Sequence, residues 1–409
     1  MNLFLHNPLS TLLLKKAVDG FAMPAKGLPS IDWVFVVLWL LLISVGLVFG
    51  TSASVAIADS RAGDPLYYLQ KDLVFLAVGA MAVIITAMIP MSVWKDYSHW
   101  VLMLAIGLLV IVLIPGVGVR VNGSQRWLNL GLFNFQVSEF AKLAMLTFMA
   151  SYLVRQGDEL RTTWAGFGKP MVILGAVLML LLLEPDFGSA VVLSGTILAV
   201  LFLAGIPLWR FVLTLGLSVL LLGYLATSSD YRMQRILSFM DPWADQFNSG
   251  YQLTQALIAF GRGEWFGVGL GNSLQKLFYL PEAHTDFVFA VIAEETGLVG
   301  AVLLIALLWT LGERILRVGR RCIVEGQGSD VMQYAGYLVS GIGLLFLFQC
   351  FINIGVSCGL LPTKGLTLPF ISYGGSSVLV WSALLALVLR ADWERRQLGG
   401  QLGEREAER

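Results

Sequence analysis

Long apolar stretches separated by short polar segments dominate the 409-residue chain. Stretches that approach or exceed about 20 residues are long enough to cross a bilayer as helices. The pattern predicts about ten such spans, at residues 31–56, 73–90, 99–115, 136–154, 170–183, 188–205, 208–226, 286–310, 331–356 and 375–391. We therefore predict an all-α polytopic membrane protein, with a large extracytoplasmic loop between the seventh and eighth transmembrane helices.

The segments outside the spans predict the domain organisation. Residues 1–30 hold three lysines but lack the order of a cleaved signal peptide, which indicates a cytoplasmic N-terminal tail. Residues 31–391 form the membrane domain. Within it, the aromatic and leucine content of the long loop 227–283 favours an ordered element on the membrane surface. Residues 392–409 are short and charged, which is typical of a disordered cytoplasmic tail.

Composition and charge agree with a membrane protein. Apolar residues make up 57% and charged residues 13%, about half the charged share of a soluble domain. With both termini in the cytoplasm, the cytoplasmic segments hold 17 of the 27 Lys and Arg residues and the outer segments nine, as the positive-inside rule requires. The net charge of zero gives no indication of nucleic acid as a partner. Cys322, Cys350 and Cys358 show neither a metal-ligand spacing nor a disulfide framework.

Residues 280–287 join the long loop to the eighth span. Pro281 blocks a helix from extending backwards, and Thr285 is a good N-cap for a helix that begins at Asp286. Asp286 is therefore expected at the mouth of a membrane helix. It either serves a function there or only caps the helix.

Two further acids, Glu294 and Glu295, follow Asp286 in the same span. At about 1.5 Å per residue they are expected roughly 12–14 Å deeper, inside the hydrocarbon, where carboxylates are costly and mark functional sites. Lys142 is the only lysine placed well inside a span. We expect it to neutralise Glu294 or Glu295, or to form a purely structural pair with Glu139, three residues away on one helix face.

An outer segment at residues 122–128 holds Arg126 and Trp127. Because a guanidinium matches phosphate oxygens bidentately, Arg126 could grip an anionic headgroup. An interfacial Arg–Trp anchor is an equally good interpretation of the same two residues.

Two other outer segments favour structural roles. In the tight turn Glu184-Pro185-Asp186, capping of the following helix is the favoured role of Asp186. The glycine series at residues 261–271 resembles a phosphate-binding loop only superficially, because no strand precedes it.

Residues 353–377 cannot form one continuous helix, because residues 359–375 contain two prolines and four glycines. Non-helical backbone near membrane depth is tolerated only where protein or a watery cavity covers it. This stretch is therefore expected to line a cavity, with Lys364 and the hydroxyls of Ser376 and Ser377 as donors.

Residues 280–295 and 353–377 resemble the signatures of the SEDS proteins (shape, elongation, division and sporulation), and the resemblance covers essentially the whole membrane region. SEDS proteins are peptidoglycan glycosyltransferases of about ten spans that polymerise lipid II at the outer face of the bacterial inner membrane. Ala283 and Thr363-Lys364-Gly365 resemble the cell-division member, since the elongation member typically has Arg in place of Ala283. The resemblance thus implies cell-wall synthesis at the division septum.

The resemblance also implies roles for individual residues. Asp286 takes the position of the catalytic carboxylate and is the candidate general base. The residues implied to bind substrate are Arg126, Trp127, Lys142, Glu282, His284, Lys364 and Ser376. The residues expected to form a supporting structural network are Glu139, Asp186, Glu294, Glu295, Pro362, Gly374 and Gly375. Glu184 departs from the Gln often seen before Pro-Asp in the family, which leaves the role of its side chain open.

The implied reaction is an inverting transfer in which undecaprenyl pyrophosphate leaves. Basic residues would stabilise that charge, and a divalent cation could share the work, although no cofactor is certain. The implied partners are lipid II, a single-pass division transpeptidase (a class B penicillin-binding protein), other divisome membrane proteins and membrane lipid.

Two other functions use the same residues. A lipid II flippase would need a polar path to the cytoplasmic side, whereas the charges cluster in the outer half of the predicted bundle. A non-catalytic scaffold of the division complex would tolerate the replacement of Asp286 by Asn.

Overall fold

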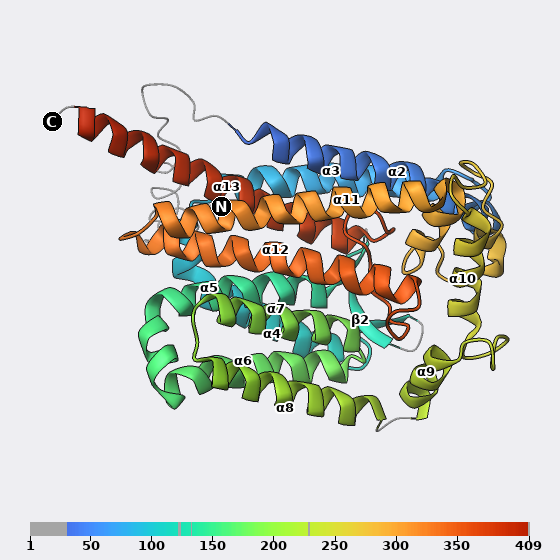
Figure 1. The fold of residues 1–409 in the computed structure, drawn as a ribbon, viewed down its shortest axis with the longest axis horizontal. Helices are drawn as coiled ribbons and strands as arrows, with labels where there is room; N and C mark the ends of the chain where they lie inside the picture. Colours follow the sequence, from blue (N-terminus) through green and yellow to red (C-terminus); the bar gives the residue numbers. More distant parts are fainter. Residues whose placement is uncertain (1–30, 122–123, 132, 228–229, 408–409) are drawn as a thin grey trace, which may run out of the picture.

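The computed structural model describes residues 31–121, 124–131, 133–227 and 230–407. The predicted N-terminal tail, residues 1–30, lies outside the described residues. Long helices dominate the described part of the chain and lie lengthwise beside one another (Figure 1).

Ten long helices within the described residues overlap the ten predicted spans. They are α2 (Trp33–Ala62), α3 (Tyr67–Met88), α4 (Met91–Leu113), α5 (Val137–Thr162), α6 (Trp164–Leu183), α7 (Phe187–Leu203), α8 (Leu208–Thr227), α11 (Val288–Glu325), α12 (Asp330–Ser357) and α13 (Gly375–Ala407). Eight are both long and apolar enough to cross a membrane, and α7 and part of α8 are shorter apolar helices. The prediction of an all-α polytopic membrane protein with about ten spans is confirmed.

Helix α5 lies inside the bundle, and other helices cover it on every side. Its residues 137–153 are buried with the exception of Phe140, and α4, α6, α7, α12 and α13 all contact it. A helix that is buried all round belongs to a core. In contrast, α3 exposes large apolar side chains such as Val74 and Met81, as expected of a helix that faces lipid.

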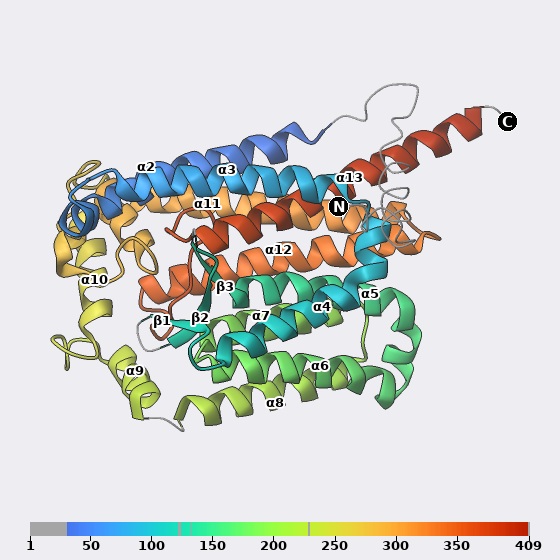
Figure 2. The ribbon, with the colours of Figure 1, turned by 180° about the vertical axis from the view of Figure 1, so that it is seen from behind.

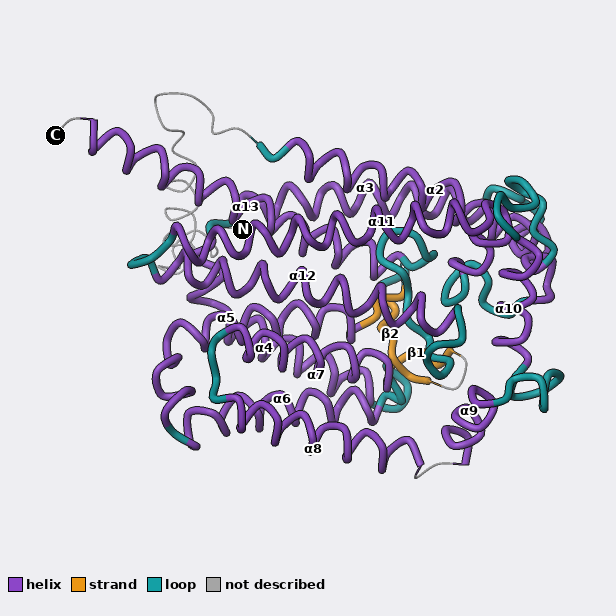
Figure 3. The backbone as a smooth tube through the Cα atoms, viewed as in Figure 1, coloured by secondary structure: helices purple, strands orange, loops and turns teal. Residues whose placement is uncertain are grey.

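Most of the irregular structure gathers at one end of the bundle, which we call the loop end: strands β1–β3, residues 230–287 and residues 358–374 (Figures 1 and 3). The strands β1 (Gly118–Val121), β2 (Ser124–Asn129) and β3 (Asn134–Gln136) form an antiparallel sheet that the sequence pattern did not predict. The long loop contains α9 (Asp230–Met240), α10 (Tyr251–Gly263) and a short π-helix, η1 (Gln275–Tyr279).

Helix α11 differs from its prediction in two ways. It begins at Val288 rather than at Asp286, and it is broken at Gly297, where φ is 72°. Only glycine fits there, because a side chain would collide with the backbone of residues 265–267. The backbone N–H groups of Leu298 and Val299 bond instead to the carbonyls of residues 264 and 265, so the break is tied to the long loop.

The charged C-terminal segment is also not as predicted. Helix α13 continues to Ala407, and its last turns lie beyond the bundle at the end opposite the loop end (Figure 2). Side chains three and four residues apart pair along it: Glu394 with Arg390, and Asp392 with both Arg395 and Arg396. These pairs stabilise a helix where the charge density alone predicted disorder.

Candidate active site

Asp286 lies in a tight turn directly before α11. The carbonyl of Glu282 accepts hydrogen bonds from the backbone N–H groups of Thr285, Asp286 and Phe287, at 3.1–3.2 Å. The Thr285 hydroxyl donates to Glu282 Oε2 at 2.7 Å, and the N-cap position belongs to Phe287. Thr285 as the cap of a helix beginning at Asp286 was therefore wrong, and Glu282 holds the turn together.

The loop after α12 lies against the Asp286 carboxylate. A Cβ atom added to Gly365 would lie 2.9 Å from Asp286 Oδ2, so the carboxylate packs on bare backbone. Asn353 of α12 donates from Nδ2 to the carbonyls of Asp286, at 3.0 Å, and Leu366, at 2.6 Å. Two segments that are far apart in the sequence thus meet at the candidate base.

Lys364, one of the residues predicted to bind substrate, directly precedes Gly365 in this loop. Its Nζ lies 4.2 Å from the centre of the Phe187 ring, a cation–π arrangement. Phe187 begins α7, and the next residue, Gly188, packs on Leu366 and on the carbonyl of Gly365. The start of α7 therefore supports the backbone that faces Asp286.

Arg126 extends from strand β2 to residues 184–186, the turn that precedes α7. It donates from Nε to the carbonyl of Glu184 at 3.2 Å and from Nη2 to that of Pro185 at 2.7 Å, and its Nη1 lies 3.7 Å from Asp186 Oδ1. The adjacent Trp127 is half-buried in the sheet. Arg126 thus ties β2 to the turn before α7.

Asp186 caps α7, as predicted. Its Oδ1 accepts from the backbone N–H of Ser189 at 3.2 Å, and its Oδ2 accepts from the Ser189 hydroxyl at 2.8 Å. Beside it, Glu184 is fully buried, and neither carboxylate oxygen has a hydrogen-bond partner among the described residues. Burial, and next the charge of Asp186, raise the pKa of Glu184 to about 8 against the opposing effect of Arg126. Glu184 is therefore largely a neutral acid at pH 7.

His284 packs among aromatic rings on the other side of the Asp286 turn. Its ring centre lies 5.5 Å from that of Tyr68 and 6.0 Å from that of Tyr373, and its carbonyl accepts from the Tyr373 N–H at 2.9 Å. Burial lowers the pKa of His284; Glu282 opposes this shift and Arg61 adds to it. The imidazole is therefore neutral at pH 7 and packs as an aromatic ring.

Lys142 does not neutralise Glu294 or Glu295, so that alternative was wrong. Its Nζ lies 2.8 Å from Glu139 Oε1 and donates to Gln349 Oε1 at 2.8 Å, with all three side chains buried. The second alternative, a pair with Glu139 on one face of α5, is the observed one.

Glu294 and Glu295 find their partners in the long loop. Glu294 pairs with Arg262 at 2.7 Å and accepts from the Ser273 hydroxyl. Glu295 pairs with Lys276 at 2.7 Å and accepts from the Ser52 hydroxyl of α2. Both acids lie before the break at Gly297, and their charged partners come from the long loop at the loop end.

The remaining predicted residues shape the loop before α13. The Ser376 hydroxyl accepts from the Gln136 N–H and donates to the Asn134 carbonyl, so it joins β3 to α13. A side chain at Gly375 would collide with the Phe75 ring, and Gly374 packs on the side chains of Thr367 and Ser377. Pro362 is half-buried in the same loop.

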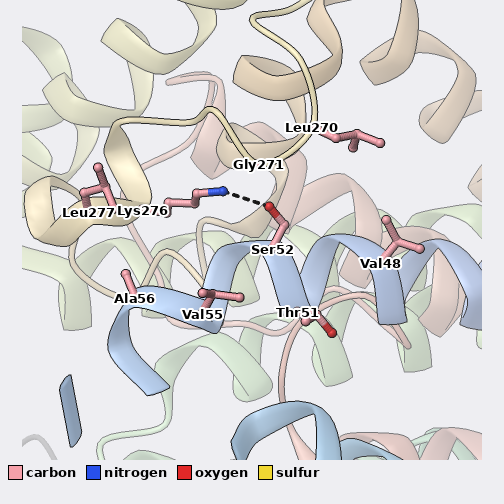
Figure 4. A pocket seen from close by; sticks show the side chains of 9 residues that line it. All are labelled: Val48, Thr51, Ser52, Val55, Ala56, Leu270, Gly271, Lys276 and Leu277. Carbon is pink, nitrogen blue, oxygen red and sulfur yellow. Dashed lines mark hydrogen bonds between the residues drawn. The ribbon is translucent and has the colours of Figure 1, made fainter. Parts of the chain in front are cut away.

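A groove of about 520 Å³ lies elsewhere at the loop end, between α2 and residues 270–277 (Figure 4). Its walls are mainly apolar, and its lysine, Lys276, donates to Ser52 at 2.9 Å. None of the residues predicted to bind substrate lines it. Across the described residues, no group of three or more His, Cys, Asp or Glu side chains is arranged to hold a metal ion.

Sequence reasoning missed several residues that build this region. Gln349 and Asn353 are the clearest case, because two amide side chains four residues apart in an apolar span are a detectable signal. Phe187 beneath Lys364, and Arg262 and Lys276 opposite the two acids, carry no signal in their local sequence.

The comparisons with known proteins agree with the fold. Residues 32–397 match the model of the cell cycle protein family FtsW/RodA/SpoVE. The chain is 50% identical over 369 residues to the probable peptidoglycan glycosyltransferase FtsW of Saccharophagus degradans, covering 90% of this chain and 94% of that protein.

Two solved structures are similar. One comes from a study of the structural coordination of polymerization and crosslinking by a peptidoglycan synthase complex, with a TM-score of 0.72 and 30% identity. The other is the Thermus thermophilus rod shape determining protein RodA, with a TM-score of 0.66 and 28% identity. Each match covers 90% of this chain and 98% of the other.

Proposed function

The chain belongs to the FtsW/RodA/SpoVE family of cell cycle proteins, and from this premise we propose that it is a peptidoglycan glycosyltransferase in which Asp286 carries the chemical step. The observation that supports Asp286 is its setting. It is a half-buried carboxylate on a rigid turn, packed on the bare backbone of Gly365 with the ammonium of the adjacent Lys364 on the same loop.

In this reaction the acceptor hydroxyl oxygen of one lipid-linked sugar bonds to the anomeric carbon of another. The bond from that carbon to the pyrophosphate oxygen breaks, and its electron pair leaves with undecaprenyl pyrophosphate. Asp286 takes the hydroxyl proton as general base. Attack from the face opposite the leaving group inverts the anomeric centre.

The leaving pyrophosphate needs fixed positive charge more than it needs a proton. Lys364 is the nearest candidate, because it stands on the loop that touches Asp286 and its Nζ lies over the Phe187 ring at the start of α7. Arg126 already donates from Nε and Nη2 to the carbonyls of residues 184 and 185, so these two groups would have to exchange the carbonyls for phosphate oxygens. Lys142 lies in the core and bonds to Glu139 and Gln349. It therefore contributes through this ion pair rather than by contact with the pyrophosphate.

We propose the following setting for the enzyme. The loop end faces the periplasm, both termini lie in the cytoplasm, and the protein works in the inner membrane at the division septum. Its partner is a synthase, which we propose to be a single-pass class B penicillin-binding protein within the divisome. The likeness to a structure from a peptidoglycan synthase complex and the name of the relatives support this setting.

Two alternative functions, a flippase and a scaffold, make predictions opposite to those of a glycosyltransferase. A flippase would carry charged groups through the bundle, whereas the candidate substrate residues gather at the loop end and Lys142 is held by Glu139 and Gln349. A scaffold would not need the Asp286 carboxylate.

The deciding experiment is polymerisation of purified lipid II by the purified chain, with and without its partner. Asp286→Asn preserves shape and should lower the rate by about 10²–10⁴-fold, because a general base has been lost. Asp64→Asn is the matched control, since it removes another carboxylate, on the turn between α2 and α3, and should leave the rate unchanged. Polymer formation by Asp286→Asn at more than about a tenth of the normal rate would exclude the assignment.

A further inference from the structure

Helix α12 presents two buried amide side chains on one face. Gln349 is fully buried and Asn353 is 2% exposed, and the two are four residues apart, one turn along the helix. Burying an amide side chain is unfavourable unless it forms hydrogen bonds. The hydrogen bonds that these two amides form therefore indicate why they occur in an apolar span.

Both amides bond to the loop that faces Asp286. Gln349 donates from Nε2 to the carbonyl of Thr367 at 2.9 Å, and Asn353 donates from Nδ2 to the carbonyl of Leu366 at 2.6 Å. Residues 363–368 form neither helix nor strand. Their successive carbonyls are thus held by side chains of α12 instead of by a regular backbone ladder.

Asn353 also joins this loop to the turn of the candidate base. The second hydrogen of its Nδ2 goes to the carbonyl of Asp286 at 3.0 Å. One amide group therefore sets the separation between Asp286 and residues 365–366, where the carboxylate packs on Gly365. Because both acceptors are carbonyls, only the NH₂ group of Asn353 can make these two bonds.

Gln349 is itself fixed from the opposite side. Its Oε1 accepts from Lys142, whose Nζ also bonds to Glu139. An ammonium only donates and a carbonyl only accepts, so the orientation of the Gln349 amide is determined. The ion pair inside α5 thus fixes the Gln349 amide, which in turn bonds to the carbonyl of Thr367.

We propose that Asn353 is a positioning residue for Asp286, with Gln349 supporting the same loop from the Lys142–Glu139 pair. This inference rests on the proposed role of Asp286 as the base. Asn353 touches no reacting atom; it fixes the turn and the loop whose relative position aims the carboxylate at the acceptor hydroxyl. A misplacement of about 1 Å can cost about 100-fold in rate.

The test uses the full-length chain with its partner, normalised to folded protein by size-exclusion chromatography. Asn353→Ala should lower kcat by about 10–100-fold and leave the KM for lipid II within about twofold. Gln333→Ala is the matched control: it removes an amide-to-carbonyl bond of the same helix, to Ile323 at the end opposite the loop end, and should leave kcat unchanged. A normal kcat for Asn353→Ala, or a loss confined to KM, overturns the inference.

A second variant reaches the same geometry without touching α12. Gly365→Ala places a methyl group 2.9 Å from Asp286 Oδ2 and should displace the carboxylate, lowering kcat with the thermal unfolding temperature unchanged. If Asn353→Ala does not fold, a normal kcat for Gly365→Ala overturns the inference, because the position of the carboxylate would then not set the rate. If Asp286→Asn is inactive while Asn353→Ala and Gly365→Ala keep a normal kcat, only the positioning role fails. If Asp286→Asn is active, the proposed function itself fails.

Discussion

Replacing Glu184 by Gln should stabilise the protein in a pH-dependent way. Glu184 is buried in the turn between α6 and α7, and its two oxygens have no hydrogen-bond partner among the described residues. Gln has nearly the same shape and stays neutral at every pH. The substitution therefore removes the ionisation of this side chain and little else.

The size of the effect follows from the pKa. Burial and the neighbouring Asp186 raise the pKa of Glu184 from 4.5 to about 8 in the folded protein. Between these values the unfolded chain has lost a proton that the folded chain retains, so the free energy of unfolding falls as pH rises. At about 1.4 kcal/mol per pH unit, the loss from pH 4.5 to 8 is on the order of 4–5 kcal/mol, and it is below about 1 kcal/mol at pH 5.

The assay is thermal unfolding in one detergent at pH 5, 6.5 and 8. Glu184→Gln and the wild type should unfold at similar temperatures at pH 5, and the variant should gain a growing advantage up to pH 8. Glu159→Gln, which removes a side chain that is 55% exposed, controls for the change of net charge. A difference that stays constant across the three pH values, or a more stable wild type at pH 8, would refute the reasoning.

Three further predictions concern residues whose observed contacts differ from the expected ones or add to them. Lys142→Met should lower the free energy of unfolding by about 3–5 kcal/mol because it leaves Glu139 buried and unpaired, and adding Glu139→Gln should restore part of that loss in denaturant unfolding. Gly297→Ala should prevent recovery of monodisperse protein, and a normal yield and unfolding temperature would contradict the close approach to residues 265–267. Because burial lowers the pKa of His284, its stabilising contribution is present above pH 6.5 and is lost as pH falls below it. His284→Phe should therefore flatten the decline of the unfolding temperature between pH 6.5 and 5, and an unchanged decline would count against it.

Local sequence predicted the helices well, because a span long enough to cross a bilayer is a property of one continuous stretch. The cap of α7 by Asp186 and the pairing of Glu139 with Lys142 were predictable for the same reason: the partners are three residues apart. Asp286 was also predicted as a site residue from its near neighbours Pro281 and Thr285, although Thr285 does not cap α11.

What could not be predicted depends on distant segments. The charged partners of Glu294 and Glu295 come from the long loop, and the break at Gly297 exists because the backbone of residues 265–267 occupies the space of a side chain. The strands β1–β3 are short and pair only with one another, which gives no long periodic pattern. The Asn353 amide donates to carbonyls that lie 67 and 13 residues away in the sequence.

The two ion pairs at the break in α11 have a consequence for how the protein is made. The basic partners of Glu294 and Glu295 precede them in the chain, by 32 residues for Arg262 and 19 for Lys276, and Ser52 comes far earlier still. When ribosomal synthesis reaches α11, every side chain that neutralises its two acids has already been made. The helix can therefore enter the bilayer with both carboxylates already paired, because their basic partners are synthesised before them.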